Sequence, residues 1–277
     1  MLRTFRLPLL PSLLAVLVAA CNAPTPPAAP ASAAAAAMSQ GGGLAEDGRG
    51  DGYEYHVRYP ELSPEWPALG KAMRAYAGQR IQQLLSDLPA TGERDANAAA
   101  LVLDLEFNVA RRTEAFVSVL AQGSLRGAAQ VEPLAAAFVL QVDGARLLAI
   151  TDLFADPDAA LRALSKECAR QLQGRYESSL RQNTGDSKTL AAALKSMQDG
   201  VTRGTAPAAP NFAVWLVDGI DSKAIGLTLI FAQAQLGMTS GGEQQVEVPA
   251  KVFYELLKPE YREAFSVDVK ELASGSR

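Results

Sequence analysis

Two carboxylic acid side chains on the polar side of one predicted strand are the residues whose type and spacing are best suited to acid–base catalysis. Asp104 and Glu106 stand two positions apart in segment 101–109, where apolar and polar residues alternate. Residues so spaced on a strand share a face, with backbones about 6.6–7 Å apart, and inverting glycosidases hold their two carboxyl groups roughly 6.5–9.5 Å apart. A catalytic pair also needs unequal environments, with one acid protonated and one base ionised. The alternation of apolar and polar residues already explains both carboxylates as part of a solvent-exposed face. A glycan hydrolase that uses this pair is therefore the alternative interpretation and not the leading one.

The single histidine limits the other catalytic arrangements. A Ser-His-Asp or Cys-His mechanism would have to use His56, which lies in an alternating segment beside tyrosines and reads as a surface or edge-strand residue. One histidine excludes multi-histidine metal sites, and no glycine-rich phosphate-binding motif occurs. Asp218 and Asp221 bracket Gly219-Ile220 and are expected in a turn between strands. We therefore expect no catalytic residue, no metal and no cofactor.

The two cysteines stand in different contexts. Cys21 follows Arg3, Arg6 and an apolar stretch over 7–18, an arrangement typical of an export signal. The apolar stretch is too short to span a bilayer, which needs roughly 20 residues. Cys168 instead falls on an apolar stripe with helical spacing, where a small buried hydrophobic side chain is the expected role.

The run Leu17-Val18-Ala19-Ala20-Cys21 resembles the bacterial lipobox. The resemblance implies that residues 1–20 are a lipoprotein-type signal peptide and that Cys21 becomes the acylated first residue. It also implies anchoring in the cell envelope, and Asn22 at the next position implies the outer membrane, with the protein facing the periplasm. Several acyl chains, each contributing about 0.8 kcal/mol per buried CH₂, would make the attachment effectively permanent.

Residues 21–52 are expected to form the lipidated cysteine and a disordered tether. The segment is rich in proline, alanine and glycine, and its stretch 47–52 is polar and reads as flexible. The pattern from Tyr53 onward is that of a folded unit, so 53–277 is expected to be one α+β domain with one or two subdomains.

Hydrophobic periodicity predicts the elements that must position these residues. Strands are expected at 53–59, 101–109, 115–125, 133–142, 146–150, 211–217, 224–231 and 243–248. Helices are expected at 65–87, 158–180 and 187–198, with a short one after Pro249. Hairpins dominate this order, which predicts an α+β fold with mainly antiparallel sheet and helices packed on one face.

Trp66 and Trp215 are the candidates for a ligand-binding surface. Exposed aromatic rings can stack on sugars or pack against a protein partner, but core packing is the default role of a tryptophan. Trp66 opens a predicted helix and Trp215 lies within a predicted strand.

Three segments in order resemble the domain of unknown function shared by the anti-sigma factor RsiV, a lysozyme sensor, and the peptidoglycan deacetylase PdaC. They are Tyr59-Pro60-Glu61-Leu62, Leu147-Leu148-Ala149-Ile150-Thr151-Asp152-Leu153-Phe154, and Gly226-Leu227-Thr228-Leu229-Ile230-Phe231 followed by Val246-Glu247-Val248-Pro249. The resemblance implies an envelope domain that binds cell-wall glycan or a lysozyme-like protein. The chain departs from the family at Arg126-Gly127-Ala128-Ala129, where a histidine is usual, and at Ala232-Gln233-Ala234-Gln235, where a tyrosine is usual.

The leading hypothesis is therefore a membrane-anchored, non-enzymatic binding module with peptidoglycan or a lysozyme-like protein as partner. The alternatives are an envelope glycan hydrolase that uses Asp104 and Glu106, and a structural or assembly lipoprotein. A nucleic-acid partner is excluded, because 26 basic against 30 acidic residues give a net charge of −4 and phosphate binding needs a clustered positive excess.

We expect mass spectrometry of the mature protein to find Cys21 as an acylated N-terminal residue. Replacing Cys21 by alanine removes the sulfur that would carry two of the acyl chains, so the variant should stay unprocessed and unlipidated. Cys168→Ala is the matched control and should leave both features unchanged. An unmodified Cys21 inside the mature chain would contradict the lipobox interpretation.

Overall fold

The computed structural model describes residues 44–267 except 63, 89–98, 128–130, 185, 221 and 238–241. The predicted signal peptide 1–20, Cys21, most of the predicted tether and Asp221 lie outside the described residues.

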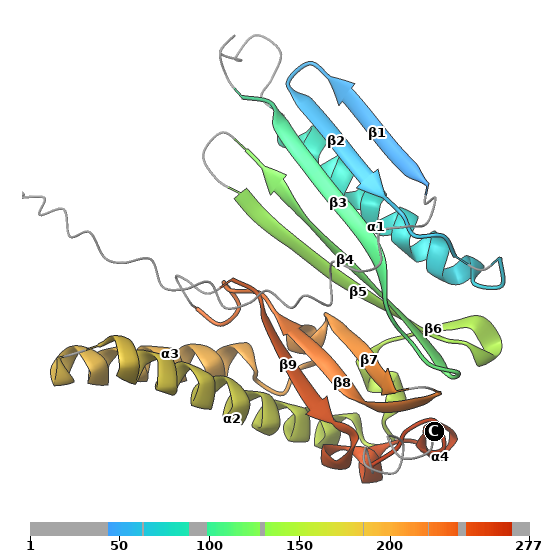
Figure 1. Cartoon of the computed structure of the whole chain (residues 1–277). Helices are drawn as coiled ribbons and strands as arrows, with labels where there is room; N and C mark the ends of the chain where they lie inside the picture. Colours follow the sequence, from blue (N-terminus) through green and yellow to red (C-terminus); the bar gives the residue numbers. More distant parts are fainter. Residues whose placement is uncertain are drawn as a thin grey trace, which may run out of the picture. The chain divides into compact units, whose positions relative to one another are not determined.

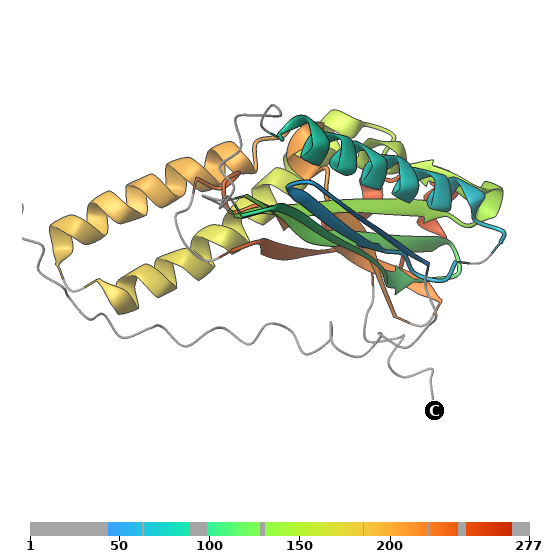
Figure 2. The same ribbon diagram turned by 90° about the horizontal axis from the view of Figure 1, so that it is seen from above.

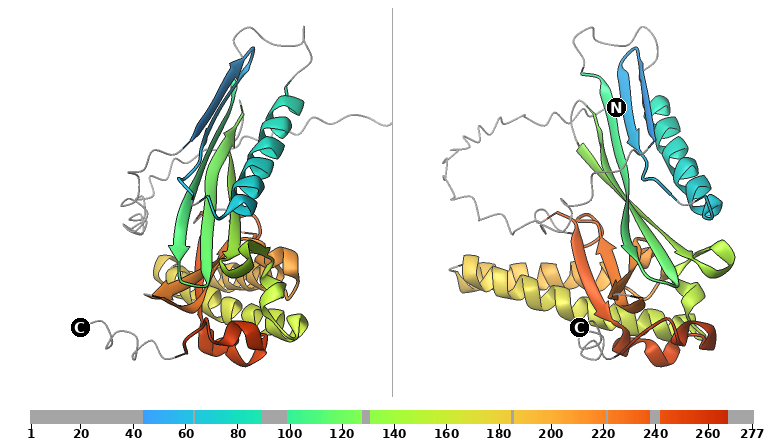
Figure 3. Two further views of the ribbon diagram at one scale, coloured as in Figure 1. Left: turned by 90° about the vertical axis from the view of Figure 1, so that its right-hand side faces the viewer. Right: turned by 45° about the vertical axis from the view of Figure 1, so that its right-hand side comes forward.

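A six-stranded mixed sheet forms the first layer (Figure 1). Its strands are β1 (Ala45–Gly50), β2 (Tyr53–Arg58), β3 (Leu101–Arg112), β4 (Phe116–Arg126), β5 (Val131–Gln141) and β6 (Arg146–Leu148), in that spatial order. All neighbours pair antiparallel except β2 and β3, which run parallel and are connected through helix α1 (Pro67–Ser86). Figure 3 shows α1 lying along one face of the sheet. This face and α1 bury one core, because the inward residues of β3 and β4 are apolar.

A three-stranded antiparallel sheet forms the second layer. Its strands are β7 (Trp215–Ile220), β8 (Lys223–Phe231) and β9 (Gln244–Pro249), in the order β7-β8-β9. Helices α2 (Pro157–Asn183) and α3 (Ser187–Gly204) lie side by side as a helical hairpin (Figure 2), and their apolar residues share the second core with the sheet. The short elements are the 3₁₀ turns Asp143–Ala145, Ile150–Leu153, Ala209–Phe212, Ala250–Val252 and Tyr254–Leu256, and helix α4 (Pro259–Arg262).

Capping residues fix where the two long helices begin. The side chain of Asp156 accepts a hydrogen bond from the backbone N–H of Ala159 at 3.0 Å, and Pro157 occupies the first helical position of α2. Asp186 caps α3 in the same way, with the N–H of Thr189 at 2.7 Å.

The predicted fold class is confirmed, since the chain folds as an α+β protein with mostly antiparallel sheets. Two predicted boundaries differ from the observed ones by four residues or more. The strand expected at 211–217 begins only at Trp215, because Pro210 lies in a 3₁₀ turn. The helix expected at 187–198 continues to Gly204.

Strand β1 corrects the prediction that residues 21–52 are a tether throughout. Residues 45–50 pair with β2 in a hairpin closed by Asp51-Gly52, with Gly52 at a φ of 77°. The glycines that suggested flexibility have a packing role: a Cβ at Gly48 would lie 2.2 Å from the ring of Tyr55. Gly50 is matched to Tyr53 in the same way, with a distance of 2.3 Å. Both glycines are needed because tyrosine rings lie across β1.

Glycine also explains how α3 continues beyond its predicted end. A Cβ at Gly200 would lie 2.2 Å from the carbonyl oxygen of Leu236, and one at Gly204 would lie 2.6 Å from that of Gln235. Glycine lowers the stability of a helix, but a larger residue at either position would clash with the backbone of the turn that α3 contacts.

We expect Gly200→Ala to lower the free energy of unfolding by about 1–3 kcal/mol, because overpacking against backbone cannot be relieved by a rotamer change. Gly174→Ala is the matched control: Gly174 also lies inside a helix, and a Cβ there meets nothing within 4 Å. The control should raise the free energy of unfolding by roughly 0.5–1 kcal/mol. Urea denaturation measures both, and equal effects of the two substitutions would contradict the packing argument.

Candidate functional site: the polar face of the six-stranded sheet

The face of the six-stranded sheet opposite α1 carries charged and amide side chains where the smaller sheet does not cover it; elsewhere Leu120 of this face packs on Leu216 and Ile230. Cross-strand register places them in rows, because residues directly opposite one another share a face. One row contains Asp47, His56, Asp104 and Ser124, and the next contains Arg58, Glu106 and Gln122. The predicted alternation of β3 is confirmed: Leu103, Leu105 and Phe107 are buried on the α1 side.

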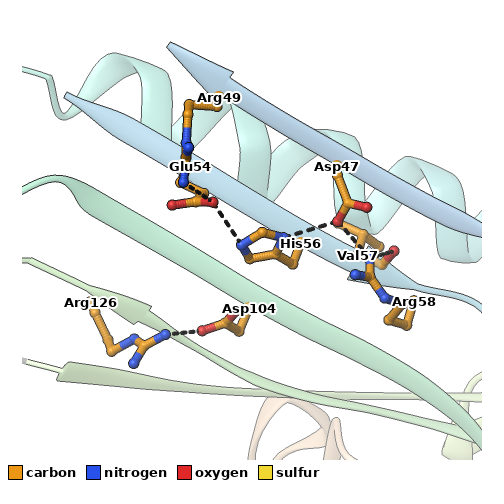
Figure 4. A network of polar contacts seen from close by, with 8 residues as sticks. All are labelled: Asp47, Arg49, Glu54, His56, Val57, Arg58, Asp104 and Arg126. Atoms are coloured by element: carbon orange, nitrogen blue, oxygen red, sulfur yellow. Dashed lines mark hydrogen bonds and ion pairs between the residues drawn. The ribbon is translucent and has the colours of Figure 1, made fainter. Parts of the chain in front are cut away.

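His56 is the centre of a network of ion pairs on β1 and β2 (Figure 4). Its Nδ1 lies 2.9 Å from Oδ1 of Asp47, and its Nε2 lies 3.3 Å from Oε1 of Glu54. Arg58 donates to the same oxygen of Asp47 at 2.6 Å, and Arg49 donates to Glu54 at 2.8 Å. The imidazole is thus fixed between two carboxylates.

The two carboxylates of this network are stabilised in their ionised form. The hydrogen bond from Arg58, followed by that from His56, lowers the pKa of Asp47 below its usual value of 3.8. The hydrogen bond from Arg49 lowers the pKa of Glu54 below 4.5. Both therefore stay ionised at neutral pH, and the face offers fixed acceptors beside fixed donors.

Asp104 and Glu106 share this face, as predicted, but they differ in their contacts. Arg126 of β4 forms an ion pair with Asp104, whose side chain is 41% exposed. Both carboxylates border a shallow depression of about 520 Å³, together with His56, Arg58 and Gln122. The structure thus brings the predicted pair together with the single histidine, which sequence alone did not place near them.

Both tryptophans are core side chains. Trp215 is 3% exposed and packs in the core of the three-stranded sheet. Trp66 is 6% exposed and lies beneath the guanidinium of Arg112, 5.0 Å from the ring centroid. Neither indole offers an open stacking surface, which agrees with the default interpretation from sequence.

Cys168 is fully buried on α2, as its stripe predicts. Burial, reinforced by the charge of Glu167, raises the pKa of its thiol to about 12. The thiol is therefore protonated at neutral pH and lacks the thiolate that a nucleophile or ligand requires.

A second polar depression, of about 460 Å³, is bordered by Asp218, Arg111 and Glu247. Asp218 lies in β7, which corrects its predicted position in a turn. Its carboxylate accepts a hydrogen bond from Oγ1 of Thr228 at 2.6 Å and lies 3.4 Å from Nε of Arg111. Burial is the main cause that raises the pKa of Asp218 above 3.8, and the nearby charge of Glu247 adds to it.

No group of three or more His, Cys, Asp or Glu in the described part of the chain is arranged to hold a metal ion. No helix within the described ranges is long and apolar enough to cross a membrane.

The chain is a two-sheet α+β protein. One helix covers the larger sheet, a helical hairpin covers the smaller one, and part of the larger sheet is left as an open polar face. The chain is similar in structure to a DUF3298 family protein from Pseudomonas aeruginosa PAO1, with a TM-score of 0.51 and 13% identity over 82% of this chain and 96% of that one. It is also similar to a member of the same family from Bacteroides fragilis NCTC 9343, with a TM-score of 0.48 and 12% identity over 79% and 92% of the two chains. No protein-family model and no curated protein matches the sequence. The chain thus shares the fold of a domain of unknown function.

We expect Asp218→Asn to raise the melting temperature at pH 7. The folded state holds the proton of Asp218 more tightly than the unfolded state does, so its contribution to stability is lost as the pH rises above 3.8. Asparagine keeps an acceptor for Thr228 without the charge. The gain should disappear as the pH falls below 3.8, where the carboxyl is protonated in both states. Asp199→Asn, in an exposed ion pair on α3, is the control for the loss of a surface carboxylate. A pH-independent gain at position 218 would argue against desolvation as the cause.

Proposed function

We propose that this protein is a lipid-anchored component of the bacterial cell envelope whose folded unit binds peptidoglycan glycan without turning it over. The observation that carries the proposal is the open polar face, where His56, Arg58, Asp104, Glu106 and Gln122 border one depression. The lipobox-like segment that ends at Cys21 supports the location. The resemblance of three segments to the domain of RsiV and PdaC supports the choice of ligand.

The charges of the face favour a glycan over a lysozyme-like protein. Its acidic side chains are Asp47, Glu54, Asp104 and Glu106, and its basic ones are Arg49, Arg58 and Arg126. Near balance gives little electrostatic attraction for a partner with a strong charge of one sign. Carboxylates, guanidinium groups and amides side by side instead provide acceptors and donors for a neutral ligand rich in hydroxyl groups.

The hydrolase alternative is retained because Asp104 and Glu106 border the same depression. Turnover of cell-wall substrate by the wild-type protein that is lost in the Asp104→Ala/Glu106→Ala variant, with unchanged folding, would favour it over simple binding. An assembly role without a small ligand is the outcome that remains if neither binding nor turnover occurs.

We expect calorimetry to detect binding of soluble peptidoglycan fragments and Glu106→Gln to weaken it about tenfold, the effect of one lost charge-assisted hydrogen bond. Asp104→Asn should act in the same direction. Glu132→Gln is the matched control and should bind as the wild type does. Glu132 is an exposed carboxylate of β5 that lies opposite Leu125, on the side of the sheet that faces α1. Titration with a lysozyme distinguishes a glycan ligand from a lysozyme-like protein ligand. If the protein binds neither peptidoglycan fragments nor lysozyme, the proposal is overturned.

A further inference from the structure

The outer edge of β1 is a free edge of the six-stranded sheet (Figure 1). Tyr59 donates its backbone N–H to the carbonyl oxygen of Leu44 at 2.9 Å, which fixes which residues of β1 bond to β2. Since bonded and non-bonded pairs alternate along an antiparallel ladder, the backbone groups of Ala45, Asp47 and Arg49 point outward. Among the described residues, none hydrogen-bonds to these outward groups.

The β9 edge of the smaller sheet is covered, unlike the edge of β1. Gln171 of α2 donates to the carbonyl oxygen of Glu247 at 2.8 Å, and Arg175 donates to that of Gln245 at 2.9 Å. Side chains of a helix thus occupy the edge of β9, which is one way to prevent further strand pairing. The edge of β1 lacks such a cover within the described part of the chain.

Side chains on both faces of β1 show what this edge can accept. On the polar face the edge carries Asp47 and Arg49, two residues apart and opposite in charge. On the other face the rings of Tyr53 and Tyr55 lie over Gly50 and Gly48, so aromatic surface extends to the edge itself. An added strand would therefore meet Asp47 and Arg49 on one face and, on the other, the tyrosine rings together with the carboxylate of Glu46, which accepts a hydrogen bond from Tyr59.

We propose that β1 pairs antiparallel with β1 of a second copy of this chain around a two-fold axis at Gly48, joining the two larger sheets. This register places Asp47 opposite Arg49 of the copy and Arg49 opposite Asp47 of the copy. Each of these two pairs exchanges both backbone hydrogen bonds through groups that point outward. On the other face Gly48 meets Gly48 of the copy, and the two Tyr55 rings come into contact across the axis.

Charge selects this register over its neighbours. A shift by two residues in one direction sets Asp47 against Asp47, and a shift in the other direction sets Arg49 against Arg49. Like charges directly opposite one another destabilise a ladder, and opposite charges stabilise it. A shift by one residue would place polar side chains on the ring face. The edge is therefore complementary to itself in one antiparallel alignment.

The first test is sedimentation of the full-length chain in detergent as a function of concentration. We expect a monomer–dimer equilibrium for the wild type, and at least a tenfold weaker dimer for Arg49→Pro, because proline removes an outward N–H that β2 does not use. Arg49→Ala keeps the backbone donor and should weaken the dimer less than proline does. A wild type that stays monomeric, or a proline variant that dimerises unchanged, overturns the proposal.

Cross-linking tests the register directly and does not depend on the proline variant. In a Cys21→Ala background, Asp47→Cys and Arg49→Cys chains are oxidised separately and as an equal mixture, with Cys168 buried in both. Opposite positions lie within disulfide reach, whereas diagonal positions are about 7–8 Å apart. The mixture should form disulfide dimers at least tenfold faster than either variant alone. Equal rates would overturn the register, and with it the self-complementary edge.

Discussion

The packing of α1 against one face of the six-stranded sheet is the constraint on which the rest of the structure depends. Strands β2 and β3 run parallel, whereas the other pairs of the sheet are antiparallel. Parallel neighbours need a crossover connection, and α1 forms part of it. The covered face takes the apolar residues of β3 and β4, including Leu103, Leu105 and Phe107. Part of the opposite face packs on the smaller sheet through Leu120, Leu216 and Ile230. The remainder carries charged and amide groups, so the polar face follows from the position of one helix.

Electrostatics then organises the open face. Each carboxylate of the His56 network lies beside a guanidinium that lowers its pKa, so these groups are neutralised in pairs without a change in protonation. The half-buried carboxyl of Asp218 in the second sheet is in the opposite situation, since desolvation raises its pKa. Two sheets of one fold thus hold carboxylates in contrasting environments. The difference lies in burial and in how closely a guanidinium approaches.

The periodicity of hydrophobic residues predicted the features that depend only on the local sequence pattern. The strand at 101–109, the shared face of Asp104 and Glu106, the stripe of Cys168 and the α+β class all follow from alternation or helical spacing. Sequence analysis missed β1, because glycines at 48 and 50 read as flexible unless their tyrosine partners on β2 are known. Asp51-Gly52 is a turn signal that could have indicated the hairpin. The pairing of Asp104 with Arg126 and the half-buried position of Asp218 beside Arg111 depend on strand register, which no single segment encodes.

The parallel pairing of β2 with β3 also has a kinetic consequence. Its first contact joins Tyr53 to Leu101, across a connection that includes the whole of α1. A chain made from its N-terminus produces the β1–β2 hairpin before the strand on which it docks exists. Closing such a long connection is slow compared with forming a local hairpin. The β1–β2 ribbon therefore keeps the β2 edge unpaired until β3 has been made, so the β2–β3 pairing forms later than the hairpin itself.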